Sequence, residues 1–511
     1  MNAQEQLAAP AAPRATRREW IGLGVLALPC LLYSMDLTVL NLAVPRLAQD
    51  LKPSAAQMLW IVDIYGFLLA GALITMGTLG DRIGRRKLLM MGATVFGIMS
   101  VLAAFAPSAQ WLIAARALLG LAAATLAPST LSLIRNMFLD DRQRTLAIGI
   151  WGASFSAGAA IGPFVGGLLL EWFWWGSVFL ASVPVMALLL ILAPRLLPEF
   201  RDSKCGRMDI PSAALSLAAV LSVIYGIKRM SEMLMFSVEH AVFIGLGLAF
   251  AMLFVRRQRK LADPLIDLAM FRIRALRVAL SINIIGLFAA FGFLLLVAQY
   301  FQLALGMGAL EAGLWTAPSG LAFVIGSLLT PALAHRIRPA NLLAAGFVVG
   351  AIGLVIVACA AAHPGMALFI TGFVLFCFGI APMGTLTTDI VMSTVPPERA
   401  GAASGISETS FELGGALGIA LLGSFVTALY RSATSGMIAP GTGVDIAPAK
   451  ETLAGAVAVA KDLAPEIGGP ILDIARQAFI GAFTQAALVA AALCIVVAII
   501  SLAFLRPSVA R

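Results

Sequence analysis

The sequence predicts an all-α, polytopic membrane protein with fourteen transmembrane helices, and three observations support this. Hydrophobic residues make up 60% of the 511-residue chain and charged residues only 12%, whereas soluble domains carry about 25% charged residues. Many apolar blocks approach or reach the roughly 20 residues that a helix needs to span a bilayer. The alternating pattern of an outer-membrane barrel is absent, so the blocks are expected to close their own backbone hydrogen bonds as helices.

The topology follows from the order of these blocks and from the positions of the basic residues. An even number of helices places both termini on one side, and segments on that side hold most of the Lys and Arg residues, as expected for the cytoplasm. The outside loop 431–476 contains an apolar stretch too short to span, which predicts a folded or interfacial hairpin. The predicted helices cover residues 20–44, 57–79, 88–106, 110–134, 145–169, 177–194, 211–229, 239–255, 275–303, 312–333, 340–360, 366–392, 401–430 and 477–505.

Composition also argues against several classes of function. The net charge of +9 could indicate nucleic-acid binding, but the basic residues form short clusters between apolar blocks, a pattern that encodes topology instead. The five cysteines include no CxxC pair and the three histidines do not cluster, so neither a disulfide framework nor a metal site is expected. Because no nucleotide-binding loop or nucleophile triad is present either, we expect no enzymatic activity.

A faint internal repeat divides the chain. Residues 77–89 and 331–343 share five of thirteen positions, and each copy joins the second and third helix of a presumed six-helix half. Weak repetition of this kind is typical of two-halved transporters. The predicted domains are a tail (1–19), a six-helix bundle (20–194), a linker with two inserted helices (195–274), a second six-helix bundle (275–505) and a second tail (506–511).

The first copy of the repeat forms a motif that we call the gating loop. A carboxylate at a helix end can bind the N-terminal dipole of a neighbouring helix and nearby arginines, and glycines let the backbones approach closely. Such a contact can lock two helices together, as a gate would. The alternative is that the segment is only a positively charged inside loop with a tight turn. The residues that define the motif are Gly77, Asp81, Arg82, Gly84, Arg85 and Arg86.

A second motif lies in the helix predicted over 145–169. Small residues spaced four apart permit a close helix crossing, and a proline bends the helix. One such glycine pair is common in helix packing, but the added Gly-Pro and double Gly are more specific. The motif consists of Gly158, Gly162, Pro163, Gly166 and Gly167.

These patterns resemble the motifs of the major facilitator superfamily. Residues 77–89 are similar to its signature loop, and the glycine motif resembles the antiporter motif of its drug exporters. Residues 35–45, which read MDLTVLNLAVP, look like the motif of the fourteen-helix drug/proton antiporter family. Arg116 and Gly120 match the superfamily's RxxQG element, although Leu119 stands where glutamine is usual.

The resemblance implies two six-helix bundles around a central cavity, plus two inserted helices. It implies a proton-coupled exporter of cationic drugs such as quaternary ammonium compounds, dyes, biguanides and viologens, working as a monomer in the bacterial inner membrane. No cofactor is expected, because the proton gradient drives transport. Two alternatives stay open: a carrier for a metabolite such as a polyamine, lipid or siderophore, and a non-transporting membrane scaffold or sensor.

Ionisable residues inside the predicted membrane helices are the first candidates for a functional site, since each costs at least ~2.5–3.5 kcal/mol on insertion scales. Asp36, Asp63 and Arg116 lie at similar depth in three helices of the first bundle and predict a charge network. The alternative is an Asp–Arg pair that only stabilises the bundle. Trp60 and Phe67 share a helix face with Asp63, which suits a bulky cation, although they could also be lipid-facing or core aromatics.

A second set of candidates lies in the helix predicted over 401–430. Glu408 and Glu412 are four residues apart, so they share one face of this helix. Two carboxylates this close disfavour double ionisation, which is the property that proton coupling needs. The exporters that the chain resembles also have carboxylates in this helix. For Asp389, near the inner end of the preceding helix, the sequence does not decide between a functional role and an ordinary interfacial charge.

Overall fold

The computed structural model describes residues 13–201, 209–233, 238–261, 264–362, 365–436 and 446–505. Each predicted transmembrane range overlaps one helix or two consecutive helices, and the ends agree within a few residues except at the end of the first helix, Leu51, and the start of the last, Pro465. Twelve helical segments of the described residues are long and apolar enough to cross a membrane. The long helices α1 (Arg17–Leu51) and α5 (Asp141–Trp172) are not among these twelve, so a total of fourteen spanning helices stays a prediction. The predicted tail 506–511 and most of the tail 1–19 lie outside the described residues.

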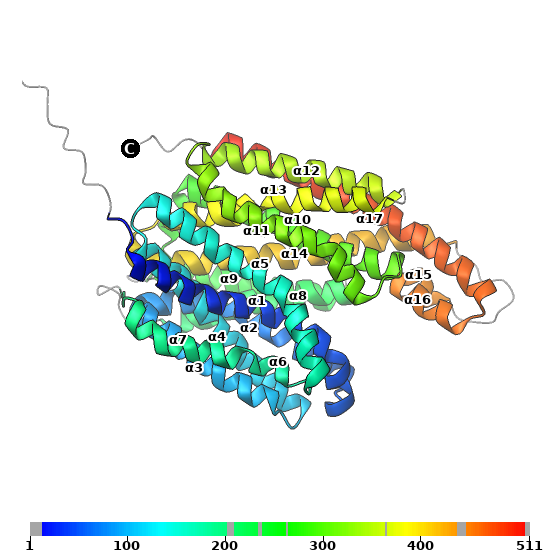
Figure 1. The fold of residues 1–511 in the computed structure, drawn as a ribbon, viewed down its shortest axis with the longest axis horizontal. Helices are drawn as coiled ribbons and strands as arrows, with labels where there is room; N and C mark the ends of the chain where they lie inside the picture. The colour runs from blue at the N-terminus through cyan, green and yellow to red at the C-terminus, as the bar shows by residue number, and fades with distance from the viewer. Residues whose placement is uncertain are drawn as a thin grey trace, which may run out of the picture. The chain divides into compact units, whose positions relative to one another are not determined.

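The chain divides into two compact units. The first comprises residues 1–209, 262–266 and 388–406, so it includes the end of α13 and the start of α14. Within it, α1 packs mainly on α5, α2 on α4, and α3 on both α4 and α7 (Figure 1). The helices that lie wholly within this unit are α1 (Arg17–Leu51), α2 (Ala55–Ile83), α3 (Arg85–Ala104), α4 (Ala109–Met137), α5 (Asp141–Trp172), α6 (Ser177–Leu180), α7 (Ser182–Leu196) and the short η3 (Pro397–Arg399).

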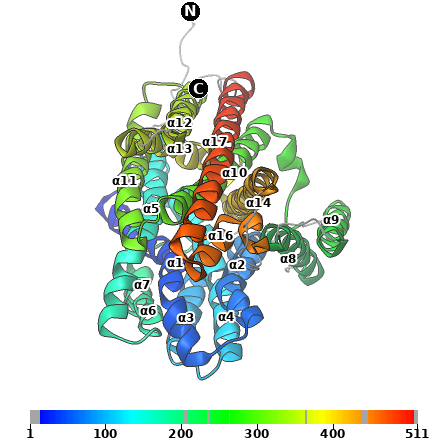
Figure 2. The same ribbon diagram turned by 90° about the vertical axis from the view of Figure 1, so that its right-hand side faces the viewer.

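The second unit comprises residues 210–261, 267–387 and 407–511. In it, α17 packs on both α10 and α12, while the two predicted inserted helices, α8 and α9, pack chiefly on each other (Figure 2). Its helices, with the two that it shares, are α8 (Ile210–Met233), α9 (Val238–Gln258), η1 (Leu268–Arg272), α10 (Arg274–Gln299), η2 (Tyr300–Ala304), α11 (Ala309–Ala334), α12 (Pro339–Ala362), α13 (Met366–Ser393), α14 (Ala400–Thr434), α15 (Ala447–Glu451), α16 (Leu453–Asp462) and α17 (Pro465–Phe504).

The predicted outside hairpin is helical in its described part. The apolar stretch that is too short to span forms α16, which packs against α17. Helix α17 begins at Pro465 rather than at residue 477. The prediction began this helix too late because Glu466, Asp473 and Arg476 interrupt the apolar pattern in its first turns. Residues 437–445 of the loop lie outside the described residues.

The glycine motif of α5 is a close crossing with α1. A Cβ atom at Gly158 would overlap the carbonyl oxygen of Leu31, and one at Gly166 would lie 2.8 Å from Val39 Cγ1. Gly162 is buried one turn from each of them, whereas Gly167 is exposed and a Cβ there would meet nothing within 4 Å. The spacing of four residues between these glycines therefore gives α5 one side on which its backbone can approach that of α1 closely.

This crossing predicts a difference between two substitutions in one motif. Gly158→Leu should destabilise the protein by about 1–3 kcal/mol, because the new side chain overpacks the contact with α1. Gly167→Leu adds the same atoms to an open position and should leave stability unchanged. Thermal unfolding of the two purified variants in one detergent checks this, and an equal loss of stability in both would contradict a close crossing at Gly158.

Candidate functional site

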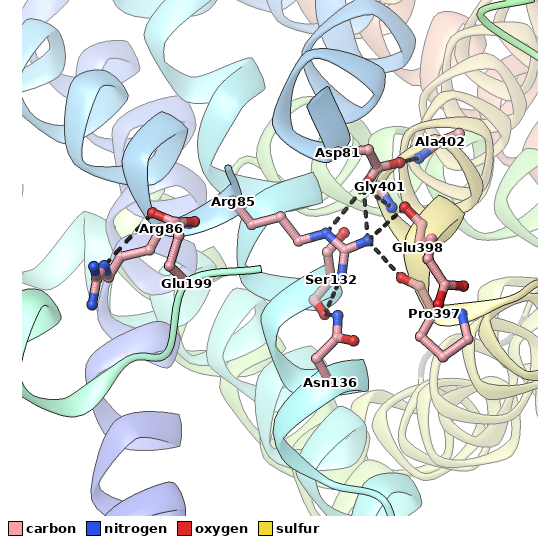
Figure 3. Close-up of polar contacts among 10 residues, drawn as sticks. All are labelled: Asp81, Arg85, Arg86, Ser132, Asn136, Glu199, Pro397, Glu398, Gly401 and Ala402. Atoms are coloured by element: carbon pink, nitrogen blue, oxygen red, sulfur yellow. Dashed lines mark hydrogen bonds and ion pairs between the residues drawn. The ribbon is translucent and has the colours of Figure 1, made fainter. Parts of the chain in front are cut away.

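The gating loop brings the carboxylate of Asp81 to the beginning of α14. Asp81 is buried, and its Oδ1 and Oδ2 accept hydrogen bonds from the N–H groups of Gly401 at 2.9 Å and Ala402 at 3.0 Å (Figure 3). These N–H groups belong to the first turn of α14, where a helix has no internal acceptors for them. The negative charge of Asp81 therefore lies at the positive end of the α14 dipole.

Arg85 connects this carboxylate to the residues that precede α14. Its Nη2 lies 2.8 Å from Asp81 Oδ1 and also donates to the carbonyl oxygens of Pro397 at 2.6 Å and Glu398 at 3.0 Å (Figure 3). Since Arg85 is only 2% exposed, each of these acceptors offsets part of the cost of burying its charge. Arg85 thus binds the turn at residues 394–399, which we call the α13–α14 turn, while Asp81 binds the first turn of α14 directly after it.

Two glycines make the approach of α2 to α14 possible. A Cβ atom on Gly77 would overlap the carbonyl oxygen of Gly401, and a Cβ on Gly401 would overlap that of Gly77. One turn later, a Cβ on Gly405 would lie 2.7 Å from the carbonyl oxygen of Leu73. The motif predicted the role of Gly77. Its counterparts on α14 were missed, because glycine is common in membrane helices and their partners are distant in sequence.

Glu199, in the segment after α7, is another residue that the sequence analysis missed. Its Oε1 accepts from the backbone N–H of Arg86 at 3.0 Å and its Oε2 from that of Lys87 at 3.1 Å. It thereby caps α3, whose N-cap residue, Gly84, has no side chain to do so and adopts a positive φ of 112°. The Arg86 guanidinium donates to the Leu197 carbonyl at 2.9 Å and lies beside Glu199 (Figure 3).

An ion pair between a buried arginine and a half-buried aspartate joins α1 to α4. Arg116 is 1% exposed, and its Nη1 lies 2.6 Å from Asp36 Oδ2. Its Nε donates to the carbonyl oxygen of Ile61 at 3.1 Å, and the guanidinium carbon lies 4.6 Å from the centre of the Tyr65 ring. Two members of the predicted network are therefore in direct contact. The third, Asp63, is half-buried on α2, two residues from Ile61.

The aromatic residues around Asp63 are also in contact. The rings of Trp60 and Phe67 meet edge to face, with 6.2 Å between their centres. Trp60 is 39% exposed, whereas Phe67 is 9% exposed. The two rings thus share one face of α2.

Two further residues of the predicted motifs have the following positions. Arg82 of the gating loop is half-buried at the end of α2, and Pro163 of the glycine motif lies in α5.

The two carboxyl groups of α14 differ in their surroundings. Glu408 is 7% exposed, and its Oε1 has no hydrogen-bond donor among the residues that the structure describes. Glu412, one turn further along, is half-buried. Burying an ionised group without a donor is costly, so a group such as Glu408 requires a functional explanation. Within the described ranges, no three His, Cys, Asp or Glu side chains are grouped to hold a metal ion.

Comparison with known proteins agrees with this architecture. Residues 26–419 match the model of the Major Facilitator Superfamily. The chain is 42% identical to the multidrug efflux pump LfrA of Mycolicibacterium smegmatis, over 97% of this chain and 98% of that protein. It is 35% identical to the methyl viologen resistance protein SmvA of Salmonella typhimurium, over 91% of this chain and 93% of SmvA.

A solved structure extends the comparison to the fold. The crystal structure of the human organic anion transporter MFSD10 (TETRAN) matches 94% of this chain and 100% of its own, with a TM-score of 0.60 and 15% sequence identity. At this identity the likeness concerns the fold alone. The family model and the relatives that match over nearly their full length confirm the resemblance seen in the motifs. The chain is a multi-pass membrane transporter, not an enzyme, and belongs to the drug-exporter family of the major facilitator superfamily.

Proposed function

We propose that this protein is a proton-coupled antiporter that exports cationic, amphipathic drugs across the bacterial inner membrane. Its substrates would include quaternary ammonium compounds, dyes, biguanides and viologens, and both of its termini would lie in the cytoplasm. The names of two relatives support this substrate class, since one is a multidrug efflux pump and the other confers resistance to methyl viologen, a dication.

The observation on which the proposal rests is the buried carboxyl group of Glu408. Its Oε1 has no donor within the described part of the chain, so the ionised form lacks the hydrogen bond that would offset burial. A carboxyl group in this setting is neutral while it is protonated. Once it has lost the proton, its negative charge attracts a cation. Glu412, four residues away, would contribute the second negative charge that a dication needs.

Charged and aromatic groups of the first unit are further candidates for interaction with cations. Arg116 is buried, pairs with the half-buried Asp36 and also donates to the backbone carbonyl of Ile61, which suits a fixed charge network that persists through the cycle. Asp63 lies on α2 with the rings of Trp60 and Phe67. A carboxylate flanked by aromatic rings attracts a cation too bulky to hydrogen-bond, through Coulomb and cation–π interactions.

Energetics favour exchange with protons over simple release. Moving one positive charge outward against a potential of 100 mV costs about 2.3 kcal/mol, so a dication costs about twice that. In the proposed cycle the drug reaches the carboxylates from the cytoplasm or the inner leaflet. When the site opens to the outside, external protons compete for the same carboxylates and eject the drug.

The gating loop would control the rate of this cycle. The Asp81 carboxylate binds the first turn of α14 and Arg85. The contact must form and break in each turnover if α14 moves, so its strength sets how long one state persists. Substrate choice would be left to the carboxylates and aromatic rings.

Asp81→Asn is therefore predicted to lower efflux of every substrate by a similar factor. The amide keeps the shape of the side chain but loses the charge that interacts with the α14 dipole and Arg85. Losing about 1.4 kcal/mol at this contact would change the rate about tenfold. Efflux of a panel of dyes measures it, with Asp50→Asn, the same change at an exposed position, as the control. Loss of one dye with normal export of the others would instead indicate that Asp81 contacts substrate.

The acidic residues should differ in their effect on substrates of different charge. Glu408→Gln and Glu412→Gln should impair dications more than monocations, because one negative site fewer remains to offset the second charge. Asp36→Asn should impair all substrates, because it leaves the buried Arg116 without its carboxylate. The measurement is energised efflux of a monovalent dye and a divalent viologen from cells with matched expression.

Glu311→Gln, at an exposed position at the start of α11, is the matched control for removal of a carboxylate. It should export both compounds at the wild-type rate. Wild-type export of both compounds by Asp36→Asn, Glu408→Gln and Glu412→Gln would make these carboxylates structural and the proposed mechanism wrong.

A further inference from the structure

The α13–α14 turn is also held where α13 ends, by residues outside the gating loop. Arg144, at the start of α5, is 4% exposed, and its Nε lies 2.9 Å from Oδ1 of Asp389 in the last turns of α13. The hydroxyl of Thr145 donates to Oδ2 of the same carboxylate at 2.9 Å. Both oxygens of Asp389 are thus bound by neighbouring residues of α5, and all three residues belong to the first unit.

Arg135, at the end of α4, binds the same end of α13. Its Nε donates to the carbonyl oxygen of Met392 at 3.1 Å, one of the last carbonyls of the helix, which have no internal donors. A cation is favoured there by the negative end of the helix dipole. Arg135 and Arg144 therefore place positive charge where α13 ends, while Asp81 places negative charge where α14 begins.

Arg144 also has a partner on its own helix. Its Nη1 lies 2.9 Å from Oδ1 of Asp141, whose side chain is 87% exposed. If α13 moves away, Arg144 keeps this carboxylate, and Asp389, whose side chain is already 20% exposed, is hydrated. Arg85 has the same arrangement, since its partner Asp81 lies four residues before it. Neither arginine would be left as an uncompensated buried charge, which is the costly outcome when an ion pair breaks.

We propose that Arg144 and Asp389 are gating residues of transport: with Thr145, they form a second latch that holds the α13–α14 turn and opens together with the Asp81 contact. This assignment rests on the proposed function, because it gives the latch its role in the transport cycle. For Asp389, it favours a functional role over that of an ordinary interfacial charge. A purely structural ion pair would need neither a reserve partner nor a carboxylate with access to water.

The test measures opening of the turn directly, without transport. Val395 lies in the α13–α14 turn and is 4% exposed, so a cysteine at this position should react with a membrane-impermeant maleimide only when the turn opens. The labelling rate of Val395→Cys is measured in inside-out vesicles, with the labelled site identified by mass spectrometry. Asp389→Asn in this background should label faster, on the order of fivefold, the lower end of typical coupling between two states.

Two further variants separate a latch from a local effect of charge. Asp141→Asn removes a carboxylate from the same guanidinium but leaves Asp389 bound, so it should label no faster than wild type. The double variant Asp389→Asn with Arg144→Gln should label no faster than the faster of the two single variants, because each substitution removes the same Arg144–Asp389 interaction. Thr145→Val removes the hydroxyl that lies 2.9 Å from both Asp389 Oδ2 and the Asp141 carbonyl oxygen but keeps the Arg144–Asp389 pair. It should raise the rate to a smaller extent, and it replaces Asp389→Asn if that variant fails to insert.

Labelling of Asp389→Asn at the wild-type rate would overturn the latch, as would an equal acceleration in Asp141→Asn. Because labelling does not depend on a drug or on protons, these outcomes are independent of whether the protein exports drugs. If the protein did not export drugs, efflux assays would show no transport, and the labelling rates of the variants would still differ as described.

Discussion

The contact between the Asp81 carboxylate and the first turn of α14 is the constraint on which much of the first unit depends. It requires two helix backbones so close that Gly77 and Gly401 admit no Cβ atom, and it requires Arg85 to be buried beside the carboxylate. Arg85 in turn needs the carbonyls of the α13–α14 turn as acceptors, and the loop needs Glu199 to cap α3. The surroundings of one charge at a helix end therefore bring together residues from three separate stretches of the chain.

Opposite charges at the two helix ends explain how such a contact can be both strong and reversible. Carboxylate oxygens meet the N–H groups where α14 begins, and guanidinium groups meet the carbonyl side where α13 ends. Two of the arginines that bind this region, Arg85 and Arg144, each keep an acidic neighbour close by in the sequence. Opening then exchanges protein hydrogen bonds for water without leaving a buried charge unpaired, so the two states can lie close in free energy.

The sequence was sufficient to predict the features that depend on local pattern. Apolar blocks located the helices, and the spacing of Asp81 and its glycines predicted a carboxylate bound to a helix N-terminus. The similar depth of Asp36, Asp63 and Arg116 predicted a charge network, and the structure brings two of the three into contact. The cap by Glu199 could not be predicted, because it lies 113 residues from Arg86 along the chain, and neither could the pairing of Arg144 with Asp389. Such contacts depend on which helix ends meet in the fold, and no periodic pattern records that.

The central claim is that buried carboxyl groups exchange a cationic drug for protons. Its most direct measurement is proton movement across the membrane of proteoliposomes that contain the purified protein, after addition of a viologen or a monovalent dye. The account predicts drug-dependent proton flux opposite to the drug, lost in Glu408→Gln. Drug transport with no accompanying proton movement, or equal proton flux in Glu408→Gln, would contradict it.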